Sequence, residues 1–513
     1  MPLPKPVVLV LVCLLPTWAQ AFDFDTLSER ARELAESGYQ KPDVALPETL
    51  SSLDYDRYRS IRFDTRKSLW RDADRPFEVQ FLHPGFNYRR AVKINVIDAD
   101  DVKPLPFDPD LFDYGPNEID REAVRDADPA LGFSGFRVHF PLNDNDEKDE
   151  VLVFQGASYF RALGEAQGYG LSARGVALDT GEMSGEEFPE FTEFWIARPG
   201  KEDRHLVIYA LMDSPRLTGA YRFELHPGPS TRMTVRAELH VRQEGGKLGL
   251  APLTSMYLFG ENQRAAQPDY RPEVHDSDGL SVHVDDEWLW RPLVNPKRLQ
   301  ISSFAAKQLH GFGLMQRDRD FHRYEDLEAR FERRPSAWVA PRGDWGAGRV
   351  ELVMIPTPDE TNDNIVAYWV PDMSPESGQP LRLEYDLRWQ MRAETQPPLA
   401  RVVQTRTGHG WQQSKDDTQR YHIDFEGDAL DALPDDTSLR ADVWAGERGT
   451  VVEQQLYRNE VTDGWRLSLR IRNEAPDRPL ELRATLKHDD EAVSETWAYL
   501  VLPTDAGRWF DPG

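Results

Sequence analysis

Cysteine is almost absent from this chain of 513 residues, which contains only Cys13. Because Cys13 falls in an apolar leader, the rest of the chain has no thiol, which excludes disulfide bonds and cysteine-ligated metal sites there. Long apolar runs are also missing. The run 7–15 is shorter than the ~20 residues that a transmembrane helix needs, and no later segment approaches that length. We therefore expect a protein that does not span a membrane.

Several familiar enzyme signatures are lacking as well. There is no P-loop, no His-Glu-x-x-His motif and no dinucleotide glycine fingerprint between a strand and a helix. The segment 170–175 is one residue too long for a Gly-x-Ser-x-Gly nucleophile elbow. The acidic stretch 143–150 does not have the glycine and glutamate spacing of an EF-hand loop. The sequence thus predicts neither a cofactor nor a metal ion.

Positive charge is scarce, and the formal net charge is -27. Such a charge repels polyphosphate, so nucleic acid and anionic membrane surfaces are disfavoured as partners, whereas a neutral glycan is not penalised. The simplest interpretation of the acidity is solubility, because charge alone rarely identifies a ligand.

The first 21 residues have the features of a secretory signal peptide. Lys5 precedes the apolar run, and Ala19-Gln20-Ala21 forms a small-x-small cleavage site. We expect the mature protein to begin near Phe22. No twin arginine precedes the apolar run, which favours export by the general secretory route.

Alternating apolar positions dominate the remaining chain and predict an all-β protein. They occur in 77–81, 92–96, 136–140 and 233–241, and again in 465–471 and 480–486. This is the pattern of strands buried on one face, which form antiparallel sheets. Turn residues between the last two segments predict a hairpin. One helix is expected near the start, where Thr26 and Glu29 form a capping-box pair and Gly38 ends it.

A connector divides the chain. The stretch 393–400 has paired prolines and no periodicity. We therefore expect a signal peptide at 1–21, a large domain at 22–392, a linker at 393–400 and a second domain at 401–513. The second domain has the size of an immunoglobulin-like sandwich, and the first is large enough for a big double sheet.

The region 275–364 contains the most chemically informative residues. Two acidic segments, HDSD at 275–278 and ETNDN at 360–364, flank a stretch rich in tryptophan and arginine. Tryptophan stacks on pyranose rings, arginine donates to hydroxyls, and one protonated and one ionised carboxyl group cut a glycosidic bond. Asp276 and Asp363 are the candidate pair, although each also fits a turn that bonds local amides. Asp363 precedes the apolar run 365–369, where desolvation would raise its pKa.

Other residues are candidates for contact with a sugar. Asp278 would share the side of a strand with Asp276, and Arg334, Trp338 and Trp345 could build subsites. Large aromatic residues are more often core, and arginines in so acidic a protein also fit a surface ion-pair network. Tyr159 and Arg161, two residues apart, fit either a cleft wall or a plain strand.

Many segments together resemble one family, the periplasmic glucan biosynthesis proteins OpgG and OpgD, across essentially the whole mature chain. The leader without twin arginines is similar to OpgG more than to OpgD. The segments that carry the resemblance are GASYFRA, YGLSARG, EFPEFTEFW, ALMDSPRLTGAYRF, APLTSMYLFGEN, HDSDGL, WRPLVNP, GFGLMQRDRDF, RRPSAWVAPRGDWGAGRVELVMIPT, ETNDNIV, PLARVVQTRTG and SETWAYL.

The resemblance implies a large galactose-mutarotase-like β-sandwich followed by a small immunoglobulin-like one, and a role in making osmoregulated periplasmic glucans with a β-1,2-linked backbone. Some members cleave β-1,2-glucan internally with inversion, and others transfer the chain to close a ring. The family's general acid falls here on Asp363 and its general base on Asp276. Phe331 stands where many OpgD proteins have a tyrosine, which removes one hydrogen bond to a subsite.

We therefore predict a periplasmic, endo-acting, inverting β-1,2-glucanase. One alternative is a transglycosylase or cyclase. Another is a non-catalytic glucan-binding assembly factor that works beside an inner-membrane glucan glucosyltransferase, and a third is a structural adhesin. The sequence is compatible with a monomer or a homodimer.

Overall fold

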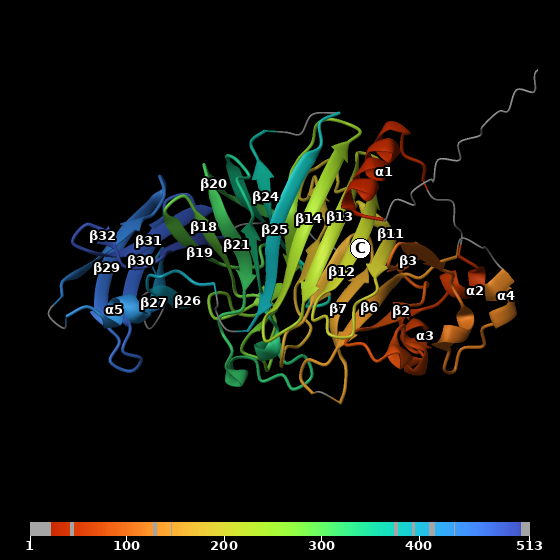
Figure 1. The fold of residues 1–513 in the computed structure, drawn as a ribbon. Coiled ribbons are helices and arrows are strands. Elements are labelled where there is room, and N and C mark those ends of the chain that lie inside the picture. The colour runs from red at the N-terminus through yellow and green to blue at the C-terminus, as the bar shows by residue number, and fades with distance from the viewer. Residues whose placement is uncertain are drawn as a thin grey trace, which may run out of the picture.

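A computed structural model describes residues 22–503, apart from 42–45, 127–130, 145, 374–377, 392–394, 410–415 and 435–436. Strands are the predominant secondary structure of the described chain (Figure 1), which confirms the prediction of an all-β protein. The signal peptide predicted at 1–21 lies outside the described residues.

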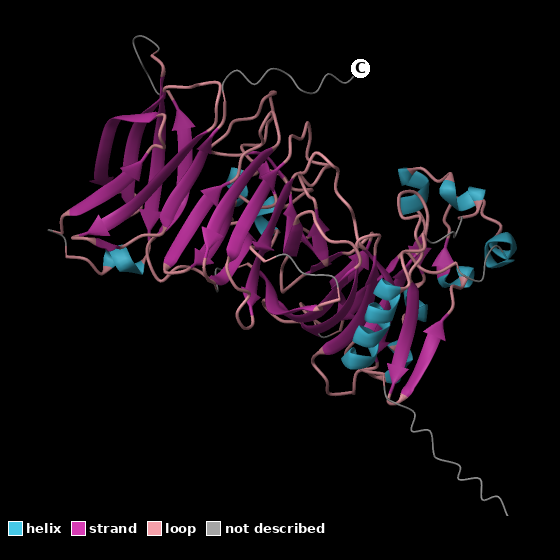
Figure 2. Cartoon of the chain, turned by 90° about the horizontal axis from the view of Figure 1, so that it is seen from above, coloured by secondary structure: helices cyan, strands magenta, loops and turns pink. Residues whose placement is uncertain are grey.

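The longest helix, α1 (Phe24–Glu36), begins three residues earlier than the sequence predicts. Asp23 caps it, because its carboxylate accepts from the backbone N–H and from the hydroxyl of Thr26, each at 2.8 Å. Thr26 is therefore a partner of the cap and not the cap itself. Leu27 and Ala31 of α1 are fully buried against strands of one of the two large sheets. Figure 2 shows α1 lying on these strands.

The other helices are short. They are α2 (Glu48–Ser51), α3 (Tyr55–Arg59), α4 (Arg121–Asp126) and α5 (Asp428–Asp431), with the 3-10 turns η1 (Thr65–Lys67), η2 (Arg71–Ala73), η3 (Pro109–Leu111), η4 (Phe321–Arg323) and η5 (Phe331–Arg333).

Two large sheets form the body of the protein. The first contains β2 (Glu78–Leu82), β6 (Gly135–Phe140), β7 (Asp149–Gln155), β8 (Tyr159–Ala162), β9 (Ser172–Arg174), β15 (Leu248–Ser255), β24 (Ile365–Pro371), β23 (Gly348–Met354) and β20 (Gln300–Ala306), with β10 (Val176–Leu178) beside β15. The second contains β28 (Leu439–Trp444), β31 (Leu480–His488), β33 (Thr496–Val501), β19 (Glu287–Pro292), β18 (Gly279–Val284), β21 (Leu309–Met315), β22 (Ser336–Pro341), β25 (Leu381–Gln390), β14 (Thr231–Val241), β13 (Leu217–His226), β12 (Leu206–Asp213), β11 (Glu190–Ala197), β3 (Lys93–Asp98) and β4 (Asp101–Leu105), with β32 (Glu491–Ala492) beside β31.

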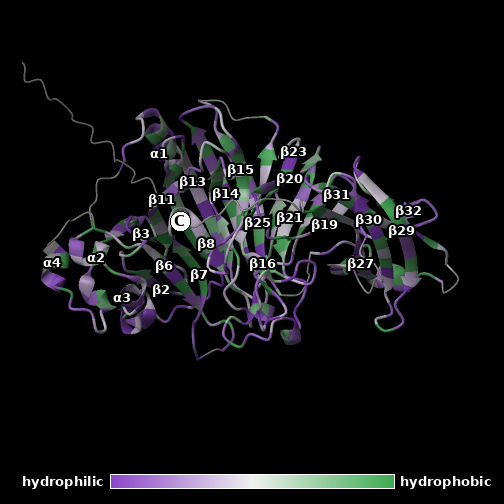
Figure 3. Cartoon of the chain, turned by 180° about the vertical axis from the view of Figure 1, so that it is seen from behind, coloured by the Kyte–Doolittle hydropathy of each residue, from purple (hydrophilic) through white to green (hydrophobic). Residues whose placement is uncertain are grey.

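The two sheets pack face to face around an aromatic core. The ring of Phe154 on β7 lies 5.2 Å from that of Phe194 on β11 and 5.1 Å from that of Phe223 on β13. All three rings are buried, so their contacts tie one sheet to the other. In Figure 3 hydrophobic residues concentrate on the strands, whereas the loops below them are mostly hydrophilic. Two short ribbons complete the large domain: β1 (Arg62–Phe63) with β5 (Phe112–Asp113), and β16 (Tyr257–Phe259) with β17 (Val274–His275).

The carboxyl-terminal part is a smaller sandwich that shares a sheet with the body. Its own sheet contains β26 (Arg401–Gly408), β27 (Thr418–Glu426), β30 (Trp465–Asn473) and β29 (Gly449–Arg458). The facing layer, β28, β31 and β33, is the end of the second large sheet, because β33 pairs in parallel with β19. Arg291 on β19 is fully buried and bonds the carboxylate of Glu481 on β31 at 2.6 and 2.7 Å.

The predicted hairpin between 465–471 and 480–486 is wrong. Both segments are strands with the predicted alternation, but β30 pairs with β27 and β29, whereas β31 pairs with β28 and β33. Buried side chains such as Leu467 and Leu482 instead meet in the core between the two layers. The alternation gives the buried face of each strand but not its neighbour.

A glycine on β21 permits close packing of the sheet against a tryptophan. A Cβ added to Gly311 would come within 2.4 Å of the ring of Trp338. We expect Gly311→Ala to lower the free energy of unfolding by about 1–3 kcal/mol, because the ring must leave its rotamer. Denaturant unfolding measures this. Gly228→Ala is the matched control, since its nearest neighbour would be 3.7 Å away, and equal midpoints for the two variants would contradict the packing.

Candidate functional site

The two acidic segments predicted to hold the catalytic pair lie side by side, attached to the same short piece of backbone. Asp276 follows β17, and its backbone N–H donates to the Met256 carbonyl at 2.8 Å. Asn364 precedes β24. Its side-chain oxygen accepts from the N–H of Tyr257 at 2.8 Å, and its amide nitrogen donates to the Tyr257 carbonyl at 3.0 Å. Met256 and Tyr257 thus join the segments of Asp276 and Asp363.

Asn364 is suited to this role because it has both an acceptor and donors on one rigid group. Its amide also donates to the carbonyl of Ile355 at 3.0 Å, and only 1% of the residue is exposed. An asparagine side chain can satisfy a buried N–H and two carbonyls at once. The sequence pattern did not single out Asn364, although it stands directly before a buried strand.

Asp276 is a buried carboxylate with a cationic partner. It is 5% exposed and forms an ion pair with Arg334. Burial raises the pKa of Asp276, and the charge and hydrogen bond of Arg334 act in the opposite direction. The Arg334 guanidinium also lies 4.2 Å from the ring centroid of Phe331, which limits its freedom. Asp276 therefore has a fixed partner that favours its ionised form.

Asp363 has a different environment. The residue is exposed to solvent, yet the protein around its carboxyl group and the charge of Asp276 raise its pKa to about 6. The charges of Arg161 and Arg334 act in the opposite direction. Because Asp276 influences the pKa of Asp363, the two carboxyl groups are close enough to interact electrostatically. Asp276 is buried and ion-paired, whereas Asp363 is exposed and has a pKa of about 6.

Tyr159 and Arg161 lie next to these carboxyl groups, as neighbours on one face of β8. Both are half-buried, and the residue between them is buried. Burial raises the pKa of Tyr159, and the charge of Asp363 raises it further. The charge of Arg161 lowers the pKa of Asp276. The Arg161 guanidinium lies 4.4 Å from the ring centroid of Tyr169, and its Nε is buried without a partner. Five of the eight predicted site residues therefore come together.

Hydrogen bonds from Arg319 hold the loop that contains Arg334. This guanidinium donates to the carbonyl of Arg334 at 2.8 Å, to that of Glu332 at 3.2 Å and to the hydroxyl of Ser336 at 3.2 Å. Gly170 packs against the same loop, where an added Cβ would lie 3.0 Å from the Arg334 Cβ. Arg319 is a positioning residue that sequence reasoning did not single out.

Two predicted tryptophans lie elsewhere. Trp338 is 3% exposed, stacks on Trp288 at 5.6 Å and covers the glycines of β21, so its ring has almost no surface for a sugar. Trp345 lies in the loop before β23, whereas Asp363 lies beyond its other end, since Met354 pairs with Ile365. The length of β23 therefore separates Trp345 from Asp363 by roughly 20 Å. We leave both out of the proposed site.

Asp278 belongs to a different set of groups than Asp276. Its carboxylate accepts from the backbone N–H of Arg317 at 2.9 Å and of Asp318 at 3.0 Å. Burial raises its pKa, and His275 and these partners oppose that effect. The pKa of Asp276 responds chiefly to burial and Arg334, not to Asp278. The shared orientation expected for the two aspartates does not occur, because the segment between β17 and β18 is not a continuous strand.

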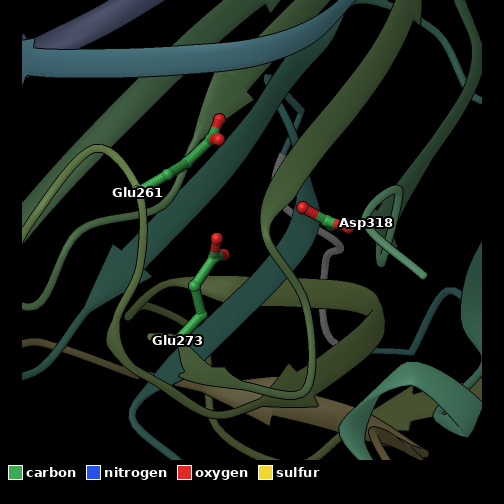
Figure 4. Close-up of side chains that lie close together, drawn as sticks. All are labelled: Glu261, Glu273 and Asp318. Atoms are coloured by element: carbon green, nitrogen blue, oxygen red, sulfur yellow. The ribbon is translucent and has the colours of Figure 1, made fainter. Parts of the chain in front are cut away.

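Asp318 is also part of an acidic cluster with Glu261 and Glu273, whose carboxylate oxygens lie within 4.8 Å of one another (Figure 4). Arg323 reaches all three carboxylates, at 3.5 Å for Glu261, 3.7 Å for Glu273 and 3.2 Å for Asp318. Burial and the charge of Glu273 raise the pKa of Glu261 to about 8 and that of Asp318 to about 6. Glu261 also accepts from the N–H of Thr405 at 2.5 Å, so the cluster braces the second domain.

None of the described helices is long and apolar enough to cross a membrane. The family described as periplasmic glucan biosynthesis protein, MdoG, matches residues 22–501.

Proteins named glucans biosynthesis protein G are similar to this chain over nearly their whole length. The protein from Ralstonia nicotianae is 51% identical over 492 residues, which cover 94% of this chain and 97% of the relative. That from Pseudomonas paraeruginosa is 48% identical over 96% and 94% of the two chains. That from Pectobacterium carotovorum subsp. carotovorum is 47% identical over 96% and 95%. The chain therefore belongs to the MdoG family of periplasmic glucan biosynthesis proteins.

Proposed function

We propose that this protein acts in periplasmic glucan biosynthesis as an inverting endo-β-1,2-glucanase. The names of its relatives support the pathway, and family membership supports a periplasmic location. The single observation that carries the enzymatic proposal is the unequal pair of carboxyl groups. Asp276 is buried against Arg334, whereas Asp363 is accessible with a pKa near 6. Such divergent environments separate an acid from a base.

In the proposed reaction Asp363, protonated, donates its proton to the oxygen of the leaving glucosyl group. Asp276, ionised, takes a proton from the water that attacks the anomeric carbon from the opposite face. Because Asp276 is only 5% exposed, we propose that the proton of the attacking water is passed to its carboxylate through an intervening hydroxyl group or water molecule. Arg334 pairs with Asp276, and Tyr159 and Arg161 interact electrostatically with the carboxyl groups. All three residues are proposed to bind the glucan.

The carboxyl groups are tested one at a time. We expect Asp363→Asn and Asp276→Asn each to lower turnover of linear β-1,2-glucan by roughly 10²–10⁴-fold, because each loses proton transfer in the transition state. New reducing ends measure hydrolysis. Asp359→Asn is the control, an aspartate of the same loop that bonds Thr361. Full activity in both catalytic variants would refute the assignment. If the unmodified protein releases rings in place of linear products, it is a cyclase. If it binds the glucan without releasing products, it is an assembly factor.

The pH profile follows from the same charges. Turnover should fall about tenfold per unit above a pH of about 6, as Asp363 loses its proton, and it should fall at low pH when Asp276 gains one. Arg161 lowers the pKa of both carboxyl groups. These are pKa values of the protein without substrate, so we expect Arg161→Gln to move both limbs of the kcat/KM profile to higher pH. Arg66→Gln, at an exposed ion pair with Asp64, should leave them in place, and a shift to lower pH in Arg161→Gln would oppose the assignment.

The attachment of Asp363 can be tested without touching a carboxyl group. Asn364→Ala leaves the N–H and carbonyl of Tyr257 without their partner, which costs about 1–3 kcal/mol of stability per unpaired group and frees the segment of Asp363. We expect kcat to fall while the folded variant retains its β-sheet spectrum. Asn362→Ala, two residues away with one bond to Asp359 at 3.3 Å, should behave as the unmodified protein. Equal kcat values for both variants would show that Asn364 does not position the acid.

A further inference from the structure

A groove of about 870 Å³ lies where the large domain meets the second domain. We call it the junction groove. One wall is the loop after β16, and the other is formed by β26, β27 and β33. Its lining residues are Asn262, Gln263, Arg264, Val294, Arg406, Thr407, Gly408, His409, Gln419, Arg420, Tyr421, His422, Tyr499, Val501 and Leu502.

The charge of the junction groove is opposite to that of the protein. The chain has 88 acidic and 61 basic residues, yet among the described lining residues none is an aspartate or glutamate. Three are arginines. Arg264 comes from the large domain, whereas Arg406 and Arg420 come from neighbouring strands of the second domain. Three guanidinium groups thus gather on a surface without a carboxylate among its described lining residues, and the nearest carboxylates, Glu261 and Glu453, lie 3.7 and 3.9 Å from Arg406 and Arg420.

These arginines keep donors available. Within the described part of the chain Arg264 has no hydrogen bond or ion pair. Arg406 touches the side chain of Gln404 and approaches Glu261 only to 3.7 Å, and Arg420 approaches Glu453 only to 3.9 Å. A guanidinium has five N–H donors. Most of the donors of the three arginines are therefore open to another acceptor.

The strand register brings the cationic groups of the second domain together. Arg406 lies opposite His422, and Gly408 lies opposite Arg420 on the paired strands β26 and β27. A Cβ added to Gly408 would meet no atom of the described residues within 4 Å. The Nδ1 atom of His422 is buried and has no partner. Burial and the charges of Arg466 and Arg420 lower the pKa of His422, so its ring is neutral at neutral pH and can exchange a hydrogen bond.

We propose that the junction groove binds an oxyanion of the phosphate or sulfate type. Arg406 and Arg420 would hold it from one side, and Arg264 would close on it from the other, since guanidinium forks match the oxygens of phosphate. Only the lining residues named above take part, and none of them belongs to the Asp276–Asp363 site. The groove is thus a second site, independent of the proposed hydrolysis.

The source of the oxyanion is a free phosphate-bearing molecule or a lipid headgroup. The net charge of -27 opposes the approach of the whole protein to an anionic bilayer, so we expect the free form to bind. A bound oxyanion would connect Arg264 with the second domain and so stabilise the junction by mass action.

Binding of inorganic phosphate to the full mature protein tests the proposal by calorimetry and thermal unfolding, with sodium chloride adjusted to constant ionic strength. We expect saturable binding and a rising unfolding midpoint. The variant Arg264→Gln/Arg406→Gln/Arg420→Gln should bind about tenfold or more weakly, because it loses charge-assisted hydrogen bonds. Arg483→Gln, an exposed arginine on β31 outside the groove, is the matched control and should bind as the unmodified protein.

The single variant Arg406→Gln, which removes one exposed side chain, serves if the triple variant does not fold, and it should also bind more weakly. Sedimentation with phosphatidylglycerol vesicles, compared with phosphatidylcholine vesicles, separates the two sources. Arginine-dependent binding to phosphate alone assigns a free ligand, and arginine-dependent binding to the anionic vesicles assigns a headgroup. No saturable phosphate binding, or equal binding by the arginine variants and the unmodified protein, overturns the proposal.

Discussion

The site depends on one local constraint, the double attachment of the Met256–Tyr257 backbone. On one side the Met256 carbonyl accepts from Asp276, and on the other the peptide groups of Tyr257 are bonded by the side chain of Asn364. Both attachments are buried, so water does not compete for them. The segments of Asp276 and Asp363, which are far apart in the chain, are thereby held in fixed positions relative to one another. A loop or an exposed ion pair would not hold them in this way.

Within this frame, small differences in surroundings give two identical side chains different properties. Arg334 forms an ion pair with Asp276, its guanidinium lies over the ring of Phe331, and Arg319 donates a hydrogen bond to its backbone carbonyl. Asp363 has no such partner among the described residues and responds instead to the negative charge beside it. The division of labour that we propose for the two aspartates is therefore a property of their neighbours.

The sequence was informative where a local pattern has one physical meaning. Alternation identified the buried face of β2, β6, β30 and β31 correctly, whereas β14 is largely buried on both faces, and the acidic segments at Asp276 and Asp363 do meet. It failed where the outcome depends on distant partners. A period of two cannot tell whether β31 follows β30 in the same sheet. Likewise, the sequence around a tryptophan such as Trp338 does not show whether the ring lies in the core or in a sugar subsite. The ring of Trp338 is buried because it packs on the glycines of β21.

The pairing of β19 with β33 has a mechanical consequence. The hydrogen-bonded ladder runs from the large sandwich into the carboxyl-terminal one, and the carboxylate of Glu495 accepts from the guanidinium of Arg317 and from the backbone N–H of Val402. The carboxyl-terminal sandwich is thus joined to the body by a shared sheet and not by its connecting segment alone. A polymer passing along the body would meet a wall of constant shape at that end.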